Sequence, residues 1–187
     1  MRISVNRSFE RRVGLFPAGF DEDGTLFCNQ NFGDYPMQIP AGKFDPMSVK
    51  PKWMLMSYGK PVTASSTAQG SDPQLAVNEN ICDWWSAGSR KSGEWLCVDL
   101  EKITGVRAIQ VNLADDKLQV PFPERQYQHD GFELRYIERD EVRARFTLEV
   151  STDGETWQTV ETIDRECANA YFEITDGVNC RYVRVTG

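Results

Sequence analysis

The sequence is short of positive charge and of histidine. It has 21 lysine and arginine residues against 28 aspartate and glutamate residues, a formal net charge of -7. Nucleic acids and anionic membranes bind to basic surfaces, so this charge argues against both as partners. A Ser-His-Asp or Cys-His catalytic site would have to use His129, the one histidine. No nucleophile motif such as Gly-x-Ser-x-Gly lies near it, and a solvated loop histidine is the simpler interpretation.

Paired cysteines and long apolar runs are also missing. The five cysteines are odd in number and show no Cys-x-x-Cys spacing. The count excludes a full disulfide framework and the spacing argues against a zinc site, so we expect free, buried thiols. No run is long enough to span a bilayer, and no signal-peptide pattern follows Met1. We therefore expect a cytoplasmic protein or a piece of a longer chain, with no membrane partner.

Short alternating segments dominate the sequence that remains. In residues 95–100, Leu96, Val98 and Leu100 point to one side, which is the period of a half-buried strand. Residues 106–113 predict a second strand, whose Ile109, Val111 and Leu113 face inward. Turns separate further expected strands at 61–66, 146–150, 157–163, 171–174 and 181–185. Helical periodicity is weak, and many short strands joined by turns indicate an all-β sandwich.

A polar loop precedes the first of these central strands. Asn78, Asn80 and Asp83 place three polar side chains within six residues, directly before Trp84 and Trp85. Two bulky rings at the end of such a loop favour a corner that closes one end of a β-core. Because they fall beside strands, we expect four tryptophans to lie in the core rather than to form a ligand platform: Trp84, Trp85, Trp95 and Trp157.

Several of these segments resemble the discoidin, or coagulation factor V/VIII type C, domain. The segments that carry the resemblance, in the family's order, are 77–80, the Trp-Ser step at 85–86, Trp-Leu-Cys-Val-Asp-Leu at 95–100, the Ser-Thr-Asp-Gly-Glu-Thr-Trp turn within 148–157, and Cys-Arg-Tyr-Val-Arg-Val at 180–185. The resemblance covers roughly residues 57–187. It implies a discoidin-like, galactose-binding-like jelly-roll β-sandwich.

The amino-terminal part predicts a β-hairpin over residues 11–32, with an acidic turn at 21–24. Its segments 11–21 and 32–36 resemble the last strands of the catalytic domain of family 43 glycoside hydrolases. In bacterial enzymes of that family a discoidin-like module follows a five-bladed propeller. The resemblance implies three parts: residues 1–40 as the propeller end, 41–56 as a proline-rich linker and 57–187 as the sandwich.

The discoidin-like resemblance also implies a candidate metal site. Such carbohydrate modules often hold a structural calcium ion in the loop before the Trp-Ser step. This sequence has Asn78 where the family has aspartate, and Asp83 where it has threonine. Calcium accepts amide oxygens beside a carboxylate, so Asn78, Asn80 and Asp83 are the candidate ligands. The alternative is that all three are ordinary turn residues.

Sugar recognition needs an aromatic face and planar polar groups that fix hydroxyls. The resemblance places that site in the loops at one end of the sandwich. The candidate residues in those loops, beside Tyr171, are Arg90, Asp115, Asp116, Arg125, Tyr127, His129 and Asn169. Since loops are generally polar, the alternative is that these residues are only solvated.

Taken together, the resemblances imply a non-catalytic accessory module of a family 43-type glycoside hydrolase. It would bind a polysaccharide or oligosaccharide, or buttress the missing catalytic domain, whose acids would lie in propeller blades outside this chain. The alternatives are a discoidin-like protein-interaction domain without a sugar site and, last, a remnant with hydrolase activity. The apolar hairpin needs a cover, which the sandwich or a second chain in a homodimer would provide.

Overall fold

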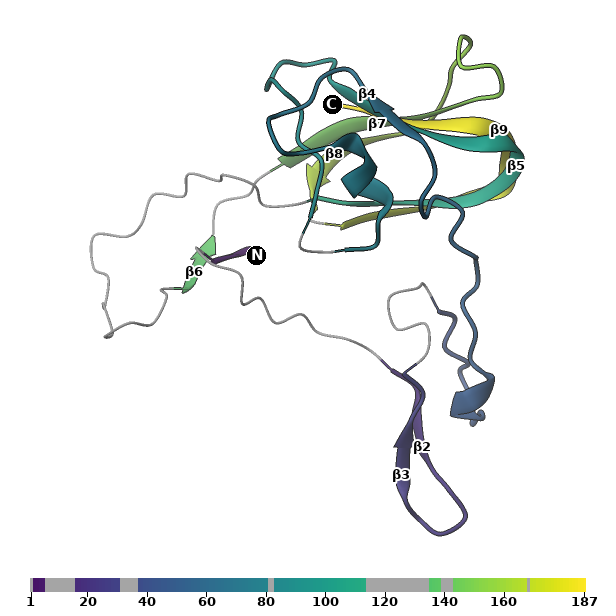
Figure 1. The fold of residues 1–187 in the computed structure, drawn as a ribbon. Coiled ribbons are helices and arrows are strands. Elements are labelled where there is room, and N and C mark those ends of the chain that lie inside the picture. Colours follow the sequence, from purple (N-terminus) through teal and green to yellow (C-terminus); the bar gives the residue numbers. More distant parts are fainter. Residues whose placement is uncertain are drawn as a thin grey trace. The chain divides into compact units, whose positions relative to one another are not determined.

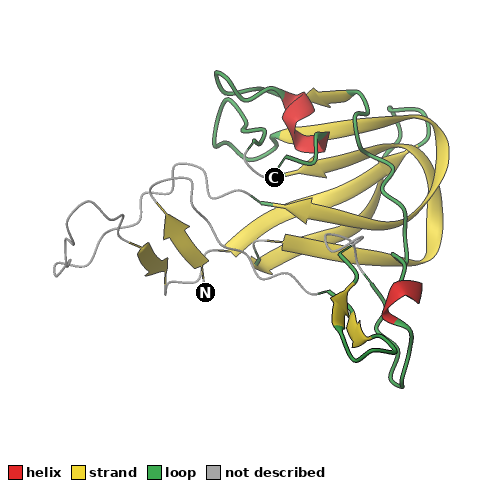
Figure 2. Ribbon diagram, turned by 60° about the horizontal axis from the view of Figure 1, so that its bottom comes forward, coloured by secondary structure: helices red, strands yellow, loops and turns green. Residues whose placement is uncertain are grey.

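The computed structural model describes residues 2–5, 16–30, 37–80, 83–113, 135–138, 143–167 and 169–187, with the backbone alone at 2–5, 135–138 and 169. Strands dominate these residues, and the only helices among them are two short 3₁₀ helices (Figures 1 and 2). No helix in the described part is long and apolar enough to cross a membrane. The elements are β1 Arg2–Val5, β2 Ala18–Phe20, β3 Leu26–Cys28, η1 Pro46–Ser48, β4 Val62–Ala64, η2 Pro73–Val77, β5 Trp95–Asn112, β6 Arg135–Glu138, β7 Arg143–Ser151, β8 Gln158–Glu166 and β9 Asn169–Thr186. The predicted all-β class is confirmed.

The chain divides into two compact units. The larger consists of Met1–Phe9 and Met56–Gly187, and the smaller is Glu10–Leu55. Strand β1 belongs to the larger unit because it pairs antiparallel with β6, from Arg2 opposite Glu138 to Val5 opposite Arg135. No pattern in the sequence predicted this pairing.

The larger unit is built on a five-stranded antiparallel sheet in the order β4-β5-β9-β7-β8. Its two long strands, β5 and β9, pair from Trp95 opposite Thr186 to Asn112 opposite Asn169 and bend together on the way. Figures 1 and 2 show the two arms of this bent ribbon lying one over the other, which makes the two layers of a β-sandwich.

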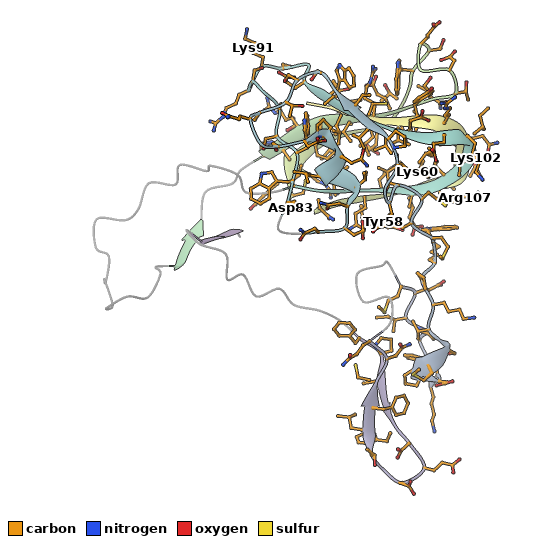
Figure 3. All side chains as sticks on the ribbon, viewed as in Figure 1. Tyr58, Lys60, Asp83, Lys91, Lys102 and Arg107 are labelled. Carbon is orange, nitrogen blue, oxygen red and sulfur yellow. The ribbon has the colours of Figure 1, made fainter. Side chains whose placement is uncertain are left out.

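This bend brings both ends of β5 and both ends of β9 to the same end of the sandwich. We call it the loop end, and its described residues are 65–72, 83–94, 113, 167, 169 and 187. The opposite end, where β5 and β9 turn back, is the bend end. Asp83 and Lys91 lie toward the first and Lys102 and Arg107 toward the second (Figure 3).

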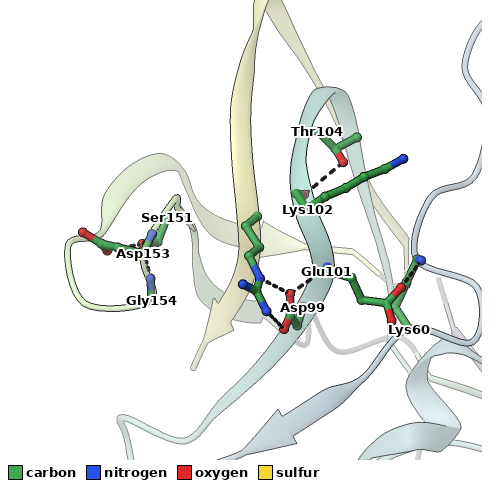
Figure 4. A network of polar contacts seen from close by, with 9 residues as sticks. Lys60, Asp99, Glu101, Lys102, Thr104, Ser151, Asp153 and Gly154 are labelled. Atoms are coloured by element: carbon green, nitrogen blue, oxygen red, sulfur yellow. Dashed lines mark hydrogen bonds and ion pairs between the residues drawn. The ribbon is translucent and has the colours of Figure 1, made fainter.

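A polar network supports the bend of β5 (Figure 4). Asp99 Oδ1 accepts a hydrogen bond of 2.7 Å from the backbone N–H of Glu101, whose φ of 68° is left-handed. Arg181 on β9 donates to both carboxylate oxygens of Asp99, and Lys60 forms an ion pair with Glu101. The regular ladder is interrupted between Asp99 and Thr104, and these contacts hold the two strands together across the irregularity.

The main core lies between the layers and is aliphatic. Its buried members are Leu100, Val106, Ile109, Phe146, Leu148, Val150, Ile163, Ala170 and Cys180. Val98, Val111 and Leu113 pack against this cluster, which confirms the inward face predicted for residues 106–113 and, at Val98 and Leu100, that predicted for residues 95–100. Cys97 is buried as well, outside the main cluster. The prediction of a half-buried strand requires Cys97, which alternates with Val98, to face the solvent. It is wrong at this position, because the outer face of β5 is covered there as well.

The expectation of free, buried thiols holds for two of the described cysteines. Cys97 and Cys180 are free and buried, and burial raises the pKa of each thiol to about 11. Their thiolate forms are therefore suppressed at neutral pH. Cys28 is free but exposed, so the expectation is wrong there: it lies on the face of a two-stranded ribbon that no described residue of its own unit buries.

The smaller unit contains the predicted hairpin, formed by β2 and β3. Its turn is closed by Asp21, whose Oδ1 accepts hydrogen bonds from the backbone N–H groups of Asp23 (3.0 Å) and Thr25 (2.8 Å). One face of the ribbon lies against Pro46, so closely that a Cβ at Gly19 would be 2.9 Å from the Pro46 ring. The smaller unit thus folds its proline-rich segment onto its own hairpin.

The other face of the hairpin is exposed and apolar. Phe20 and Leu26 sit opposite each other in the pairing and are 71% and 64% exposed. Ala18 and Cys28 form the adjacent pair on this face. We call these four residues the hairpin face.

Candidate functional site

Ser71 fixes the backbone of the tryptophan pair at the loop end. Its hydroxyl donates to the carbonyl oxygen of Trp84 (2.7 Å) and accepts from the backbone N–H of Ser86 (2.6 Å). The carbonyl of Ser86 in turn accepts from the N–H of Ala68 (2.9 Å). The loop after β4 and the loop before β5 are therefore joined on both sides of Trp85.

Ser66 makes a second junction between the same loops. Its carbonyl oxygen accepts from the indole N–H of Trp85 (3.1 Å), and its hydroxyl accepts from the N–H of Gly88 (2.8 Å). Gly88 is packed closely, since a Cβ there would lie 3.2 Å from the carbonyl oxygen of Thr67. The loop end thus has a fixed backbone on which side chains can be presented.

The prediction that four tryptophans lie in the core is wrong. Trp84 is 38% exposed at the loop end, and Trp85, Trp95 and Trp157 are half-buried. The core between the layers is filled by aliphatic side chains and one phenylalanine instead. An indole carries an N–H group that needs a partner or water, which favours the margin of a core over its centre.

Trp157 lies against Arg184 rather than in the interior. The guanidinium of Arg184 lies 3.8 Å from the centre of the Trp157 ring, and its Nε donates to Glu149 (2.9 Å). Thr186 also donates to Glu149 (2.8 Å), and these hydrogen bonds, that of Arg184 first, hold the pKa of Glu149 below its ordinary value. These contacts link β7 to β9. Trp84, the most exposed of the four, is therefore the tryptophan best placed to contact a ligand.

The structure brings the three candidate calcium ligands together. Asp83 Oδ2 accepts from the side-chain amides of Asn78 (3.2 Å) and Asn80 (2.6 Å), and Asn78 Oδ1 accepts from the N–H of Asn80 (2.8 Å). Among the described residues no three His, Cys, Asp or Glu side chains are grouped as metal ligands. The cluster therefore holds one carboxylate and two amides, and the amide nitrogens face the carboxylate.

Of the candidate sugar-binding residues, Arg90 and Tyr171 have described side chains, and Arg90 is the one that lies in a loop. It is exposed, in the segment of the loop end that precedes β5. Asn169 begins β9 opposite Asn112, so its backbone also lies at the loop end. Tyr171 is turned to Glu173, to which its hydroxyl donates (2.8 Å). The others lie outside the described residues: Asp115, Asp116, Arg125, Tyr127 and His129.

Sequence reasoning missed Glu94 at the loop end. Its carboxylate accepts hydrogen bonds from the hydroxyls of Ser65, Ser66 and Ser89. These hydrogen bonds lower the pKa of Glu94 to about 2. Two of the serines lie 28 and 29 residues away in sequence, so no local pattern could have linked them to this carboxylate.

Comparisons with known proteins agree with this architecture. Residues 75–185, more than half of the chain, match the family model described as the NedA-like, galactose-binding domain. Among curated proteins, none matches this sequence closely enough to count as a relative.

Three solved structures illustrate the likeness of fold. Chitosan-binding module 1 of a chitosanase/glucanase from Paenibacillus sp. IK-5 is 20% identical, with a TM-score of 0.53 over 71% of this chain and 84% of that one. Module 2 of the same enzyme, in complex with chitotriose, is 17% identical, with a TM-score of 0.53 over 71% and 86%. A fucose binding module from Streptococcus pneumoniae is 16% identical, with a TM-score of 0.52 over 71% and 82%. The shared β-sandwich confirms the predicted fold.

Proposed function

Because the chain belongs to the NedA-like, galactose-binding domain family, we propose that its sandwich is a non-catalytic saccharide-binding module whose site is the loop end. One observation carries this proposal: Trp84 exposes its ring there on a backbone fixed by Ser71. An indole face stacks on the C–H groups of a sugar ring. Solved modules of similar fold that bind chitotriose and fucose support a sugar as the ligand class.

Recognition at this site combines stacking with hydrogen bonding. Trp84 supplies the apolar face, and Arg90, exposed in the same segment, supplies a planar set of N–H donors for ring hydroxyls. The contacts of Ser66 and Ser71 order the backbone before any ligand arrives, so binding does not have to pay that entropy. Asn169, at the same end, is a further candidate.

Isothermal titration calorimetry with galactose, fucose and chitotriose tests the proposal. We expect measurable binding of at least one of these saccharides and a loss of about tenfold or more in affinity for Trp84→Ala, since stacking on an aromatic ring contributes on the order of 1 kcal/mol or more. Tyr58→Ala is the matched control, because Tyr58 is 63% exposed but lies outside the loop end. Absence of binding to every saccharide would favour the protein-interaction alternative.

We further propose that the module is an accessory part of a family 43-type glycoside hydrolase. Residues 1–40, apart from β1, which pairs with β6 in the larger unit, would then be the end of its catalytic domain, as the resemblance of segments 11–21 and 32–36 implies. The hairpin face supports this, because an apolar surface of that kind needs a partner. In the longer protein the partner is the catalytic domain, and in the isolated chain it is a second copy. Propeller strands encoded upstream of Met1 would support the proposal, and a stop codon there would overturn it.

We also propose that Asn78, Asn80 and Asp83 hold a calcium ion weakly. The amide nitrogens of Asn78 and Asn80 donate to the carboxylate of Asp83, so the three side chains are already grouped before binding. Rotation of each amide would turn its oxygen toward the ion, and for Asn78 this breaks the hydrogen bond that its Oδ1 accepts from the N–H of Asn80. Calcium would supply a structural cross-link in this loop. A single carboxylate implies low affinity.

A further inference from the structure

Glu94 occupies a junction of three chain segments. Its Oε2 accepts from Ser65 and Ser66, which follow β4, and its Oε1 accepts from Ser89, in the loop before β5. Its backbone carbonyl accepts from the N–H of Gly187 (2.8 Å), directly after β9. One residue thus connects the loop after β4, the loop before β5 and the end of β9.

The hydroxyl of Ser66 links Glu94 to the loop before β5, which carries Trp84 and Trp85. It donates its one proton to Glu94 (2.6 Å) and accepts the N–H of Gly88 (2.8 Å). A hydroxyl has a single proton, so its acceptor side faces Gly88 because the proton is committed to the carboxylate. The orientation of Ser66 therefore depends on an acceptor at position 94.

We propose that Glu94 is the positioning residue of the loop end, which holds the segments that carry Trp84 and Arg90 in a binding-competent arrangement without touching the ligand. The inference rests on the proposed function for the identity of the ligand, but the positioning itself concerns the loops alone. Glu94 reaches the tryptophan pair through Ser66, whose carbonyl oxygen also accepts from Trp85.

The variant Glu94→Gln has nearly the shape of the wild-type side chain but no charge, so it distinguishes positioning through the carboxylate from simple filling of space. In Glu94→Gln one of the two acceptor oxygens becomes an NH₂ group, so either the Ser65 and Ser66 pair or Ser89 loses its acceptor. Glu155→Gln is the matched control, since Glu155 is exposed in the turn between β7 and β8 at the bend end.

The pH dependence of saccharide binding distinguishes positioning by the charged carboxylate from a merely structural role. The three serine hydroxyls hold the pKa of Glu94 at about 2, with Lys91 as the charged group that also lowers it. Wild-type binding should therefore be flat from pH 7 to about 4. Ser65→Ala with Ser89→Ala returns the pKa of Glu94 toward its ordinary value, and affinity should then fall as the pH drops from about 5 to 4.

The experiment combines titration of the saccharide that the wild type binds with hydrogen exchange at the Gly88 amide. We expect Glu94→Gln to weaken binding about tenfold and to speed exchange at Gly88, with no change in Glu155→Gln. Binding and exchange that are unchanged in Glu94→Gln, or a double serine variant as flat in pH as the wild type, overturn the inference. If the wild type binds no saccharide, the proposed function fails, and faster Gly88 exchange in Glu94→Gln still supports the positioning role.

Discussion

Arg181 and Asp99 form a bidentate ion pair between β9 and β5, with Nε to Oδ1 and Nη2 to Oδ2 both at 2.8 Å. The pair lies where the regular ladder is interrupted, and Asp99 also accepts from the backbone of Glu101. The hydrogen bonds of Arg181 are the first cause that holds the pKa of Asp99 below its ordinary value. A charged pair thus stabilises a backbone that turns away from regular strand geometry.

We predict that Asp99→Ala lowers the melting temperature of the protein by a few degrees. The variant leaves Arg181 without its carboxylate and the N–H of Glu101 without its acceptor, and a loss on the order of 1 kcal/mol shifts the melting temperature of a chain of this size by about 2–4 °C. Arg145→Ala is the control, since Arg145 is 74% exposed and its ion pair with Asp164 is a surface contact. Differential scanning calorimetry measures both, and equal melting temperatures for Asp99→Ala and Arg145→Ala would contradict the prediction.

Acid should destabilise the fold over a defined range of pH. The pKa values of Glu94 and Asp153 are lowered to about 2, from ordinary values of 4.5 and 3.8, by serine and backbone hydrogen bonds respectively. The unfolded chain therefore takes up protons first as the pH falls. The stability from these carboxylates is complete above about pH 5 and is lost between about pH 4.5 and 2.

Urea unfolding at pH 7, 5, 4 and 3 measures this loss. We expect equal midpoints at pH 7 and 5, and lower midpoints at pH 4 and 3. Asp153→Asn should start from a lower midpoint at pH 7 and decline less on acidification, because residue 153 then no longer titrates. A decline as steep as that of the wild type would show that Asp153 does not contribute to it.

The parts of the fold that alternation could predict are those with one buried face. Val98, Leu100 and Ile109 point into the core as their period of two requires. The burial of Cys97 could not be read in this way, because it depends on what covers the outer face of β5. The pairing of β1 with β6 could not be read either, since more than a hundred residues separate the strands and neither has a distinctive pattern.

The candidate site was predictable where a motif was local. Asn78, Asn80 and Asp83 are close in sequence, and the structure assembles them. The exposure of Trp84 was not predictable, because a tryptophan beside a strand can face the core or the solvent with the same local sequence. The junction at Glu94 depends on serines brought near by the pairing of β4 with β5.

Calcium should raise the melting temperature through the loop of Asn78, Asn80 and Asp83. A ligand that binds the folded state alone stabilises it by about 2.7 kcal/mol when its concentration is a hundred times the dissociation constant. We therefore expect a higher melting temperature in millimolar calcium than in chelator, and no such difference for Asp83→Ala. Asp153→Ala serves as control, because Asp153 lies in a turn at the other end of the sandwich. Equal melting temperatures for the wild type in calcium and chelator would exclude the site.

The hairpin face should make the isolated chain self-associate. Phe20 and Leu26 are largely exposed on a ribbon of two three-residue strands, and covering apolar surface contributes about 25 cal/mol per Å². We expect sedimentation velocity to show a concentration-dependent dimer for the wild type and a monomer for Phe20→Ser with Leu26→Ser. Ile103→Ser, at another exposed apolar side chain, should behave as the wild type does.

Truncation at Ser57 is a weaker form of this test, although we expect it to cost stability or to change the oligomeric state. It removes β1 together with the hairpin, and β1 pairs with β6 in the larger unit, so a loss of stability would have two causes. The double serine variant leaves β1 in place and changes only the face that needs a partner. If the wild type is monomeric at every concentration and proteases remove residues 1–56 without a change in the melting temperature, the hairpin has no partner in this chain.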